Sequence, residues 1–84
     1  MRIGCVDIGS NAVRTQIVEF GDNHYFKTLY QKRYPIRLGK SVFTNGKLKK
    51  KLIAAVAQKL LSFSNKLEKY SVDTHRLVAT LSLI

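Results

Sequence analysis

Hydrophobic and polar positions divide the chain into segments of two kinds. Residues 3–8 and 13–20 are rich in β-branched and apolar side chains, and so is the stretch 25–34 that follows a Gly-Asp-Asn turn. Such segments bounded by turn residues are typical of strands. The chain's only proline, Pro35, has no amide hydrogen to give to a sheet, so we expect the third strand to end there or to be an edge strand.

Residues 45–70 follow a different pattern, in which apolar side chains recur every three or four positions. This spacing predicts an amphipathic helix of about six to seven turns. We expect Thr44 or Asn45 to cap its start. Four lysines in residues 47–51 oppose the helix dipole there, so this end is expected to fray or to hold an anion. The expected apolar face consists of Leu48, Leu52, Val56, Leu60, Phe63 and Leu67.

A last β-rich stretch, residues 76–80, follows the helix. A helix between two strands usually makes a right-handed crossover, so this strand should lie parallel to one of its neighbours in the sheet. The 84 residues contain no linker, repeat or low-complexity segment and suffice for at most one small domain. The sequence therefore predicts an α/β fold with the element order βββαβ.

The charge balance narrows the classes of partner. Fifteen Lys and Arg against five Asp and Glu give a formal net charge of +10. Polyphosphate, nucleotides, nucleic acid and acidic lipid all suit such a charge. Nucleic acid is less favoured, because no recognised binding signature accompanies the lysines of residues 47–51 and the aromatic residues lie mostly in strand segments.

Other classes of protein fit the composition poorly. No apolar run approaches the roughly 20 residues of a membrane span, and no signal-peptide pattern opens the chain. We therefore expect a cytoplasmic protein without a membrane partner. The single cysteine, Cys5, excludes an intramolecular disulfide. His24 and His75 lie in separate segments without the spacing of zinc ligands.

Candidate chemistry is concentrated after the first strand. Asp7 interrupts the apolar segment, and a carboxylate is costly to bury alone, so we expect it to point from the strand end toward a metal ion or its waters. The amides of Gly9, Ser10 and Asn11 can converge on an anion, and the two polar side chains add hydrogen bonds. An ordinary β-hairpin turn has the same composition, and that alternative stays open.

The loop after the third strand, residues 37–40, is basic and contains a glycine. In one interpretation, Arg37 or Lys40 reaches an anion held by the first turn. In the other, the loop is a solvated connection between strand and helix.

Taken together, these segments resemble the start of the exopolyphosphatase and guanosine pentaphosphate phosphatase family, Ppx/GppA. The Asp-Ile-Gly-Ser-Asn turn at 7–11, with Val13 and Arg14 after it, is similar to the family's first phosphate motif. Residues 37–39 resemble its basic loop. Residues 46–48 resemble the opening of its helix, and 78–80 the strand that ends its first βββαβ unit. The Asp-x-Gly turn alone is shared with the wider actin, Hsp70 and sugar-kinase superfamily, so the later segments decide the family.

The resemblance implies a ribonuclease H-like fold of the actin-like ATPase type. It also implies a hydrolase that removes terminal phosphates from polyphosphate, or the 5′ phosphate of guanosine pentaphosphate, with Mg²⁺. Asp7 would then help to position the metal. Phosphate would be bound by Gly9, Ser10, Asn11 and Arg37.

Parts of the family pattern are missing from these 84 residues. The second phosphate motif and the catalytic glutamate normally lie further along the chain, and neither Glu19 nor Glu68 occupies the catalytic position. Ala12 replaces the hydroxyl residue that usually follows the turn. We therefore expect residues 1–84 to be a truncated, single partial domain without a catalytic residue of its own. Its partners would include the missing C-terminal part of the enzyme; a small anion-binding module and a nucleic-acid-binding protein are the alternatives.

Overall fold

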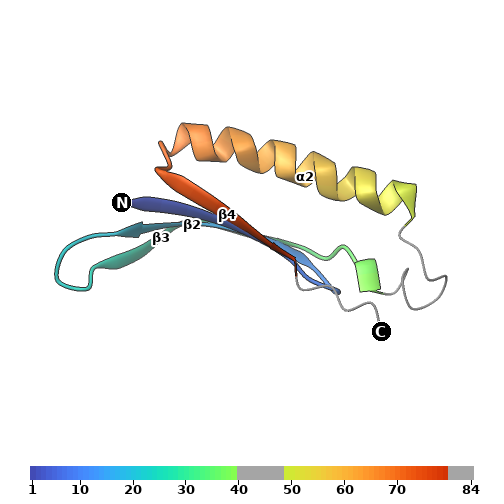
Figure 1. The fold of residues 1–84 in the computed structure, drawn as a ribbon, viewed down its shortest axis with the longest axis horizontal. Helices are drawn as coiled ribbons and strands as arrows, with labels where there is room; N and C mark the ends of the chain where they lie inside the picture. The colour runs from blue at the N-terminus through green and yellow to red at the C-terminus, as the bar shows by residue number, and fades with distance from the viewer. Residues whose placement is uncertain (40–48, 80–84) are drawn as a thin grey trace.

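Four strands and one long helix make up the parts of the chain that the computed structural model describes, residues 1–39 and 49–79 (Figure 1). The predicted order, three strands, a helix and a strand, is confirmed, and so is the α/β class. In chain order the elements are β1 (Arg2–Ile8), β2 (Val13–Phe20), β3 (Phe26–Tyr34), α2 (Lys50–Lys69) and β4 (Thr74–Ala79).

The strands form one mixed sheet in the order β3-β2-β1-β4. β1 and β3 each pair with β2 in antiparallel fashion, whereas β4 pairs with β1 in parallel. The expected parallel pairing after the helix is therefore confirmed. β3 ends at Tyr34, directly before Pro35, and it forms one edge of the described sheet.

One irregularity interrupts the pairing of β2 with β3. Ile17 lies opposite Tyr30 and Val18 lies opposite Thr28, so Leu29 has no residue across from it. An extra residue of this kind is a β-bulge, which bends its strand and increases the local twist.

Figure 1 shows α2 lying over one face of the sheet, and the core residues come from these two layers and the loop after β3. Strand alternation sends every second side chain toward the core, and Val13 and Ile17 of β2 are fully buried there. The apolar helix positions predicted within the described residues either are buried or pack against the core. These positions are Leu52, Val56, Leu60, Phe63 and Leu67.

α2 begins later than predicted. Lys49 stands before its first turn in an extended conformation, and the Lys49 side chain makes no capping hydrogen bond. The prediction that Thr44 or Asn45 caps this helix is therefore wrong; both residues, like Leu48, lie outside the described residues. The first turn carries Lys50 and Lys51 and no acidic residue, so no side chain within it offsets the positive end of the helix dipole.

Gly4 sets how closely α2 approaches the sheet. A Cβ atom at this position would overlap the Cδ2 atom of Leu67 and would lie 3.6 Å from Cζ of Phe63. A larger residue would therefore push the C-terminal half of the helix away from β1 or force Leu67 into another rotamer.

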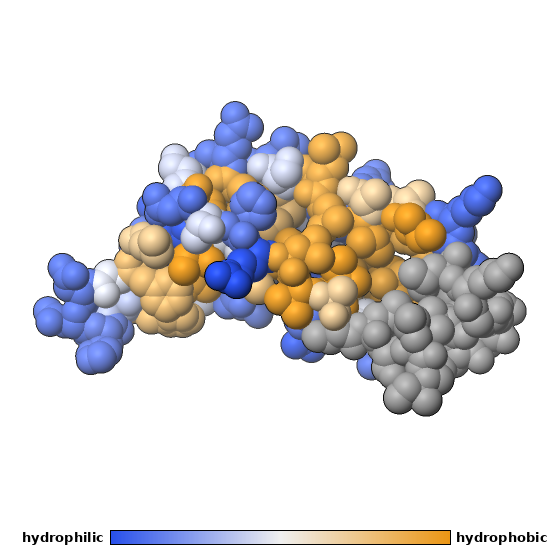
Figure 2. Space-filling model, viewed as in Figure 1, coloured by the Kyte–Doolittle hydropathy of each residue, from blue (hydrophilic) through white to orange (hydrophobic). Residues whose placement is uncertain are grey.

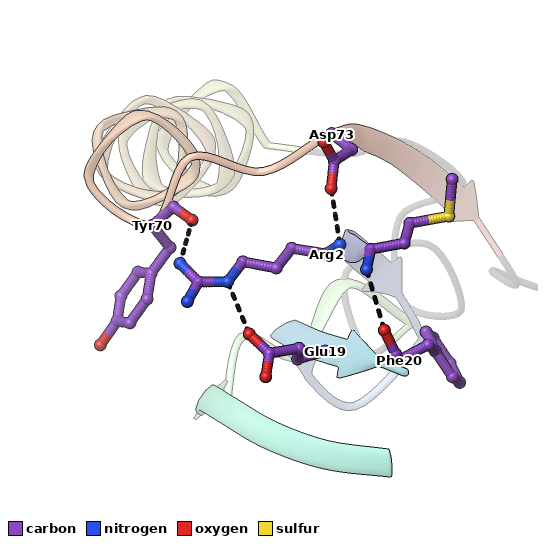
Figure 3. Close-up of polar contacts among 6 residues, drawn as sticks. Arg2, Glu19, Phe20, Tyr70 and Asp73 are labelled. Carbon is purple, nitrogen blue, oxygen red and sulfur yellow. Dashed lines mark hydrogen bonds and ion pairs between the residues drawn. The ribbon is translucent and has the colours of Figure 1, made fainter. Parts of the chain in front are cut away.

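Arg2 joins the sheet to the end of α2 (Figure 3). Its Nε donates to Oε2 of Glu19 at 2.9 Å, and its Nη1 donates to the carbonyl oxygen of Tyr70 at 2.6 Å. Its backbone amide donates to Oδ2 of Asp73 at 2.7 Å, and the Asp73 amide donates back to the Arg2 carbonyl at 2.9 Å. The hydrogen bonds of Arg2 thus connect β1 with β2, with the C-terminus of α2 and with the segment that leads into β4. We call these four residues the Arg2 clamp.

Replacing Arg2 with alanine should lower the free energy of unfolding by about 1 to 2 kcal/mol. The substitution removes an ion pair and a charged hydrogen bond to a helix-terminal carbonyl, although solvent screens part of both because the Arg2 side chain is 37% exposed. Urea unfolding measures the change, and Arg76→Ala on the exposed strand β4 is the control. An equal loss in both variants would show that the clamp adds nothing beyond an ordinary surface arginine.

Candidate phosphate-binding turn

The turn that carries the candidate residues connects β1 to β2. Ile8 pairs with Val13 across the ladder, and the amide of Gly9 donates to the carbonyl of Ala12 at 2.9 Å. The β-hairpin that the sequence left as an alternative is therefore present. It does not conflict with anion binding, because its tip is polar: Asn11 is exposed and Ser10 is partly exposed.

The basic loop lies against this turn. The amide of Gly39 donates to the carbonyl of Ser10 at 2.9 Å. A Cβ atom at residue 39 would lie only 2.9 Å from the Cβ of Ser10, so the contact requires glycine. Leu38, which is 3% exposed, fixes the loop in the core. Arg37 precedes this anchored pair with an exposed side chain, while Lys40 lies outside the described residues.

Leu38 is the part of this arrangement that sequence reasoning missed. The charge of Arg37 and the flexibility of Gly39 are visible in the sequence. A single leucine between them belongs to no periodic pattern, so no signal indicated that the loop is anchored.

Asp7 lies near the end of β1, on the face of the sheet opposite α2. The ladder places it across from Arg14 on β2 and beside Val78 on β4. Oppositely charged residues that face each other across a ladder interact favourably. Asp7 thus interrupts the apolar strand at a position where the neighbouring strand carries an arginine.

The residues present suit a divalent cation only with further ligands. Within residues 1–39 and 49–79, no group of three or more His, Cys, Asp or Glu side chains is arranged to hold a metal ion. Mg²⁺, however, is usually bound by one or two carboxylates together with waters and substrate phosphates. A single carboxylate next to the candidate turn fits this second mode.

A separate cavity of about 340 Å³ lies between α2 and the sheet. Its lining is entirely apolar, so it offers nothing to a phosphate. Figure 2 shows a broad apolar surface on this side of the molecule, over α2 and β4. The lining residues are Ile8, Leu38, Ile53, Val56, Ala57, Leu60 and Ala79.

No protein-family profile and no curated protein matches this sequence. Among solved structures, a Ppx/GppA family member from Aquifex aeolicus is 26% identical with a TM-score of 0.86, and the match covers 94% of this chain and 26% of that chain. A second structure, of the Aquifex aeolicus PPX-GPPA enzyme, is 28% identical with a TM-score of 0.84 and the same coverage. The resemblance to the Ppx/GppA family is confirmed.

An exopolyphosphatase from Cytophaga hutchinsonii has the same fold, with a TM-score of 0.82 at 23% identity; the match covers 94% of this chain and 25% of that one. The chain thus spans about a quarter of the length of the Ppx/GppA structures it matches. Its sheet and helix correspond to their N-terminal domain, which bears out the predicted fold class. Among the described residues, no helix is long and apolar enough to cross a membrane.

Replacing Gly39 with alanine should displace the basic loop from the turn. We expect the backbone amide resonances of Ser10 and Asn11 to shift, and the free energy of unfolding to fall by about 1 kcal/mol, because a methyl group must fit where Ser10 lies. Gly21→Ala is the matched control, since the Cβ there would meet mainly the side chain of Tyr25, which is 44% exposed and can move. Unchanged Ser10 and Asn11 resonances in Gly39→Ala would contradict the close contact.

Proposed function

We propose that this chain supplies the first phosphate-binding turn of a Ppx/GppA-type phosphatase acting on polyphosphate or guanosine pentaphosphate. The observation that carries the proposal is the packing of Gly39 on Ser10. It brings the loop that bears Arg37 to the polar hairpin tip, at one end of the sheet.

Each residue of the turn has a distinct role in this proposal. The Gly9 amide already donates a hydrogen bond to the carbonyl of Ala12. Gly9 therefore contributes through its lack of a side chain, which lets the phosphate approach the backbone closely. Ser10 and Asn11 donate backbone and side-chain hydrogen bonds to phosphate oxygens. Arg37 offers a guanidinium that suits two oxygens of one phosphate.

Asp7 would hold Mg²⁺ together with waters and oxygens of the substrate. The ion would neutralise charge on the phosphates when bound. The contribution of this chain is to fix one carboxylate at the strand end that leads into the turn, across the ladder from Arg14 on the neighbouring strand.

We propose no catalytic residue within the 84 residues. Glu19 is held by Arg2, at the opposite end of β1 from the turn, and Glu68 lies exposed near the end of α2. Neither is placed to activate a water at the Ser10–Asn11 tip. The proposal assigns that step, and the second phosphate motif, to a C-terminal part of the enzyme corresponding to the rest of the Ppx/GppA chains. Residues 1–84 are then one partial domain of a cytoplasmic enzyme.

The second candidate function is a small basic module that holds polyphosphate or a nucleotide without catalysis. The net charge of +10 favours it. The two candidates share the binding step, so a binding assay tests both, and reconstitution with the C-terminal part tests the enzyme alone.

Replacing Asn11 with alanine should weaken the binding of tripolyphosphate in Mg²⁺ by roughly 5- to 30-fold. This corresponds to the loss of one or two hydrogen bonds to a charged group, about 1 to 2 kcal/mol. Isothermal titration calorimetry with the 84-residue chain measures it. Asn65→Ala, on the exposed surface of α2, is the matched control. Equal affinities of the two variants for tripolyphosphate would contradict the proposal that the turn binds phosphate.

The 84-residue chain should release no phosphate from polyphosphate above background, with or without Mg²⁺. The reason is that the proposal assigns Asp7, the acidic residue beside the turn, to the metal ion, and that neither Glu19 nor Glu68 lies at the turn. A colorimetric phosphate assay on the purified chain checks this expectation. Strong Mg²⁺-dependent release that Asp7→Asn abolishes would contradict it.

A further inference from the structure

The edge of α2 that faces β3 carries lysines held over tyrosine rings. The Nζ atom of Lys59 lies 4.9 Å from the ring centroid of Tyr34, and that of Lys66 lies 5.6 Å from the ring centroid of Tyr30. Lys32 of β3 adds a third ammonium group, 5.5 Å from the Tyr34 ring. We call these five residues the lysine–tyrosine seam.

The rings that hold these ammonium groups are themselves anchored. Tyr30 stacks on Phe63, with centroids 6.2 Å apart and ring planes 29° apart, and Phe63 is 3% exposed. Tyr30 also meets the ring of Tyr70, again at 6.2 Å. Burial and the neighbouring Tyr30 raise the pKa of the Tyr34 phenol, so it stays neutral. The lysines are thereby held in place by rings that do not cancel their charge.

No carboxylate neutralises the seam within the described residues. The ion pair found there joins Arg2 to Glu19 and involves none of the three lysines. Lys59 and Lys66 are seven residues apart on one side of α2, which corresponds to about 10 Å along the helix. The seam is therefore a short linear track of uncompensated positive charge.

This track starts near the candidate turn. Tyr34 pairs with Val13, the first residue of β2 after the hairpin, whereas Tyr30 pairs with Ile17 further along that strand. The seam thus leads away from the turn along the junction of β3 and α2.

We propose that the lysine–tyrosine seam binds the extended part of a linear polyphosphate chain whose terminal phosphate lies in the Ser10–Asn11 turn. The inference rests on the proposed function, and it selects a long polyphosphate over guanosine pentaphosphate as the substrate class. In guanosine pentaphosphate a ribose and its base interrupt the phosphates, so this molecule cannot lay a continuous run of phosphates along the seam.

The rings also argue against nucleic acid as the occupant. Proteins that bind single strands without sequence preference stack bases on open aromatic faces. The Tyr34 ring is contacted by two lysines, and the Tyr30 ring packs on Phe63 and Tyr70 and carries Lys66. A chain of phosphates needs only the ammonium groups.

The test compares two double variants of the 84-residue chain that remove the same charge. Lys59→Gln/Lys66→Gln alters the seam, whereas Arg33→Gln/Arg76→Gln removes two exposed arginines from the opposite sheet face. The probes are long-chain polyphosphate and tripolyphosphate, and affinity is measured by calorimetry at several salt concentrations. Thermal melts confirm folding, and Lys59→Arg/Lys66→Arg keeps the charge and the ring contacts.

We expect the seam variant to lose long-chain affinity roughly tenfold, and the slope of log affinity against log salt to fall by about two, one for each lysine removed. Tripolyphosphate binding should stay within twofold, and the arginine-for-lysine variant should restore the long-chain affinity. Equal losses in the two glutamine variants would overturn the inference, since a diffuse positive field would then explain binding. Tighter binding of single-stranded DNA than of long-chain polyphosphate would overturn the choice of partner.

The outcome also separates this inference from the proposed function. If Asn11→Ala weakens tripolyphosphate binding and the seam variant binds the long chain normally, phosphate binding by the turn is supported and polyphosphate binding by the seam is contradicted. If the seam variant binds the long chain more weakly and Asn11→Ala has no effect on tripolyphosphate binding, the seam is supported as a polyphosphate surface and phosphate binding by the turn is contradicted.

Discussion

The closure of β4 onto β1 is the constraint on which the rest of the structure depends. Two parallel strands need a crossover connection, which here is α2. The end of α2 must lie close to the start of β1 so that β4 can pair with β1 in the observed register. Gly4 permits the approach, and the Arg2 clamp fixes its end by tying the last turn of α2 and Asp73 to the sheet. The opposite end of the same strand leads into the polar hairpin. Positioning of the candidate turn therefore begins with contacts made at the far end of β1.

Much of the fold was predictable from the sequence because its signals are local. The strands were expected within two residues of their observed ends, since β-branched segments between turn residues leave few alternatives. The apolar face of α2 followed from its period. Its start did not, because the periodic pattern continues through Leu48 and so does not mark the first residue of the helix. Periodicity indicates which side of a helix is buried, not where the helix begins.

The candidate site was predictable in composition but not in assembly. Asp7 and the residues 9–11 stand together in the sequence, so a polar turn after a strand could be expected. The packing of residue 39 on Ser10 joins segments far apart in the chain, and it depends on the burial of Leu38. The seam was missed for the same reason: its lysines and tyrosines come from different elements, and each looks like an ordinary surface residue within its own pattern. Tertiary packing decides such juxtapositions.

The bulge at Leu29 makes the two edges of the described sheet unequal. Along β3 the interrupted pairing bends and twists the strand, and the bend makes that edge a poor template for another chain. β4 has no such interruption: its register with β1 is regular over six residues, and both Leu77 and Val78 are exposed. The β4 edge of the sheet is therefore better suited than the β3 edge to pair with a further strand. A polypeptide that extends this sheet would pair with β4, the strand that follows the helix.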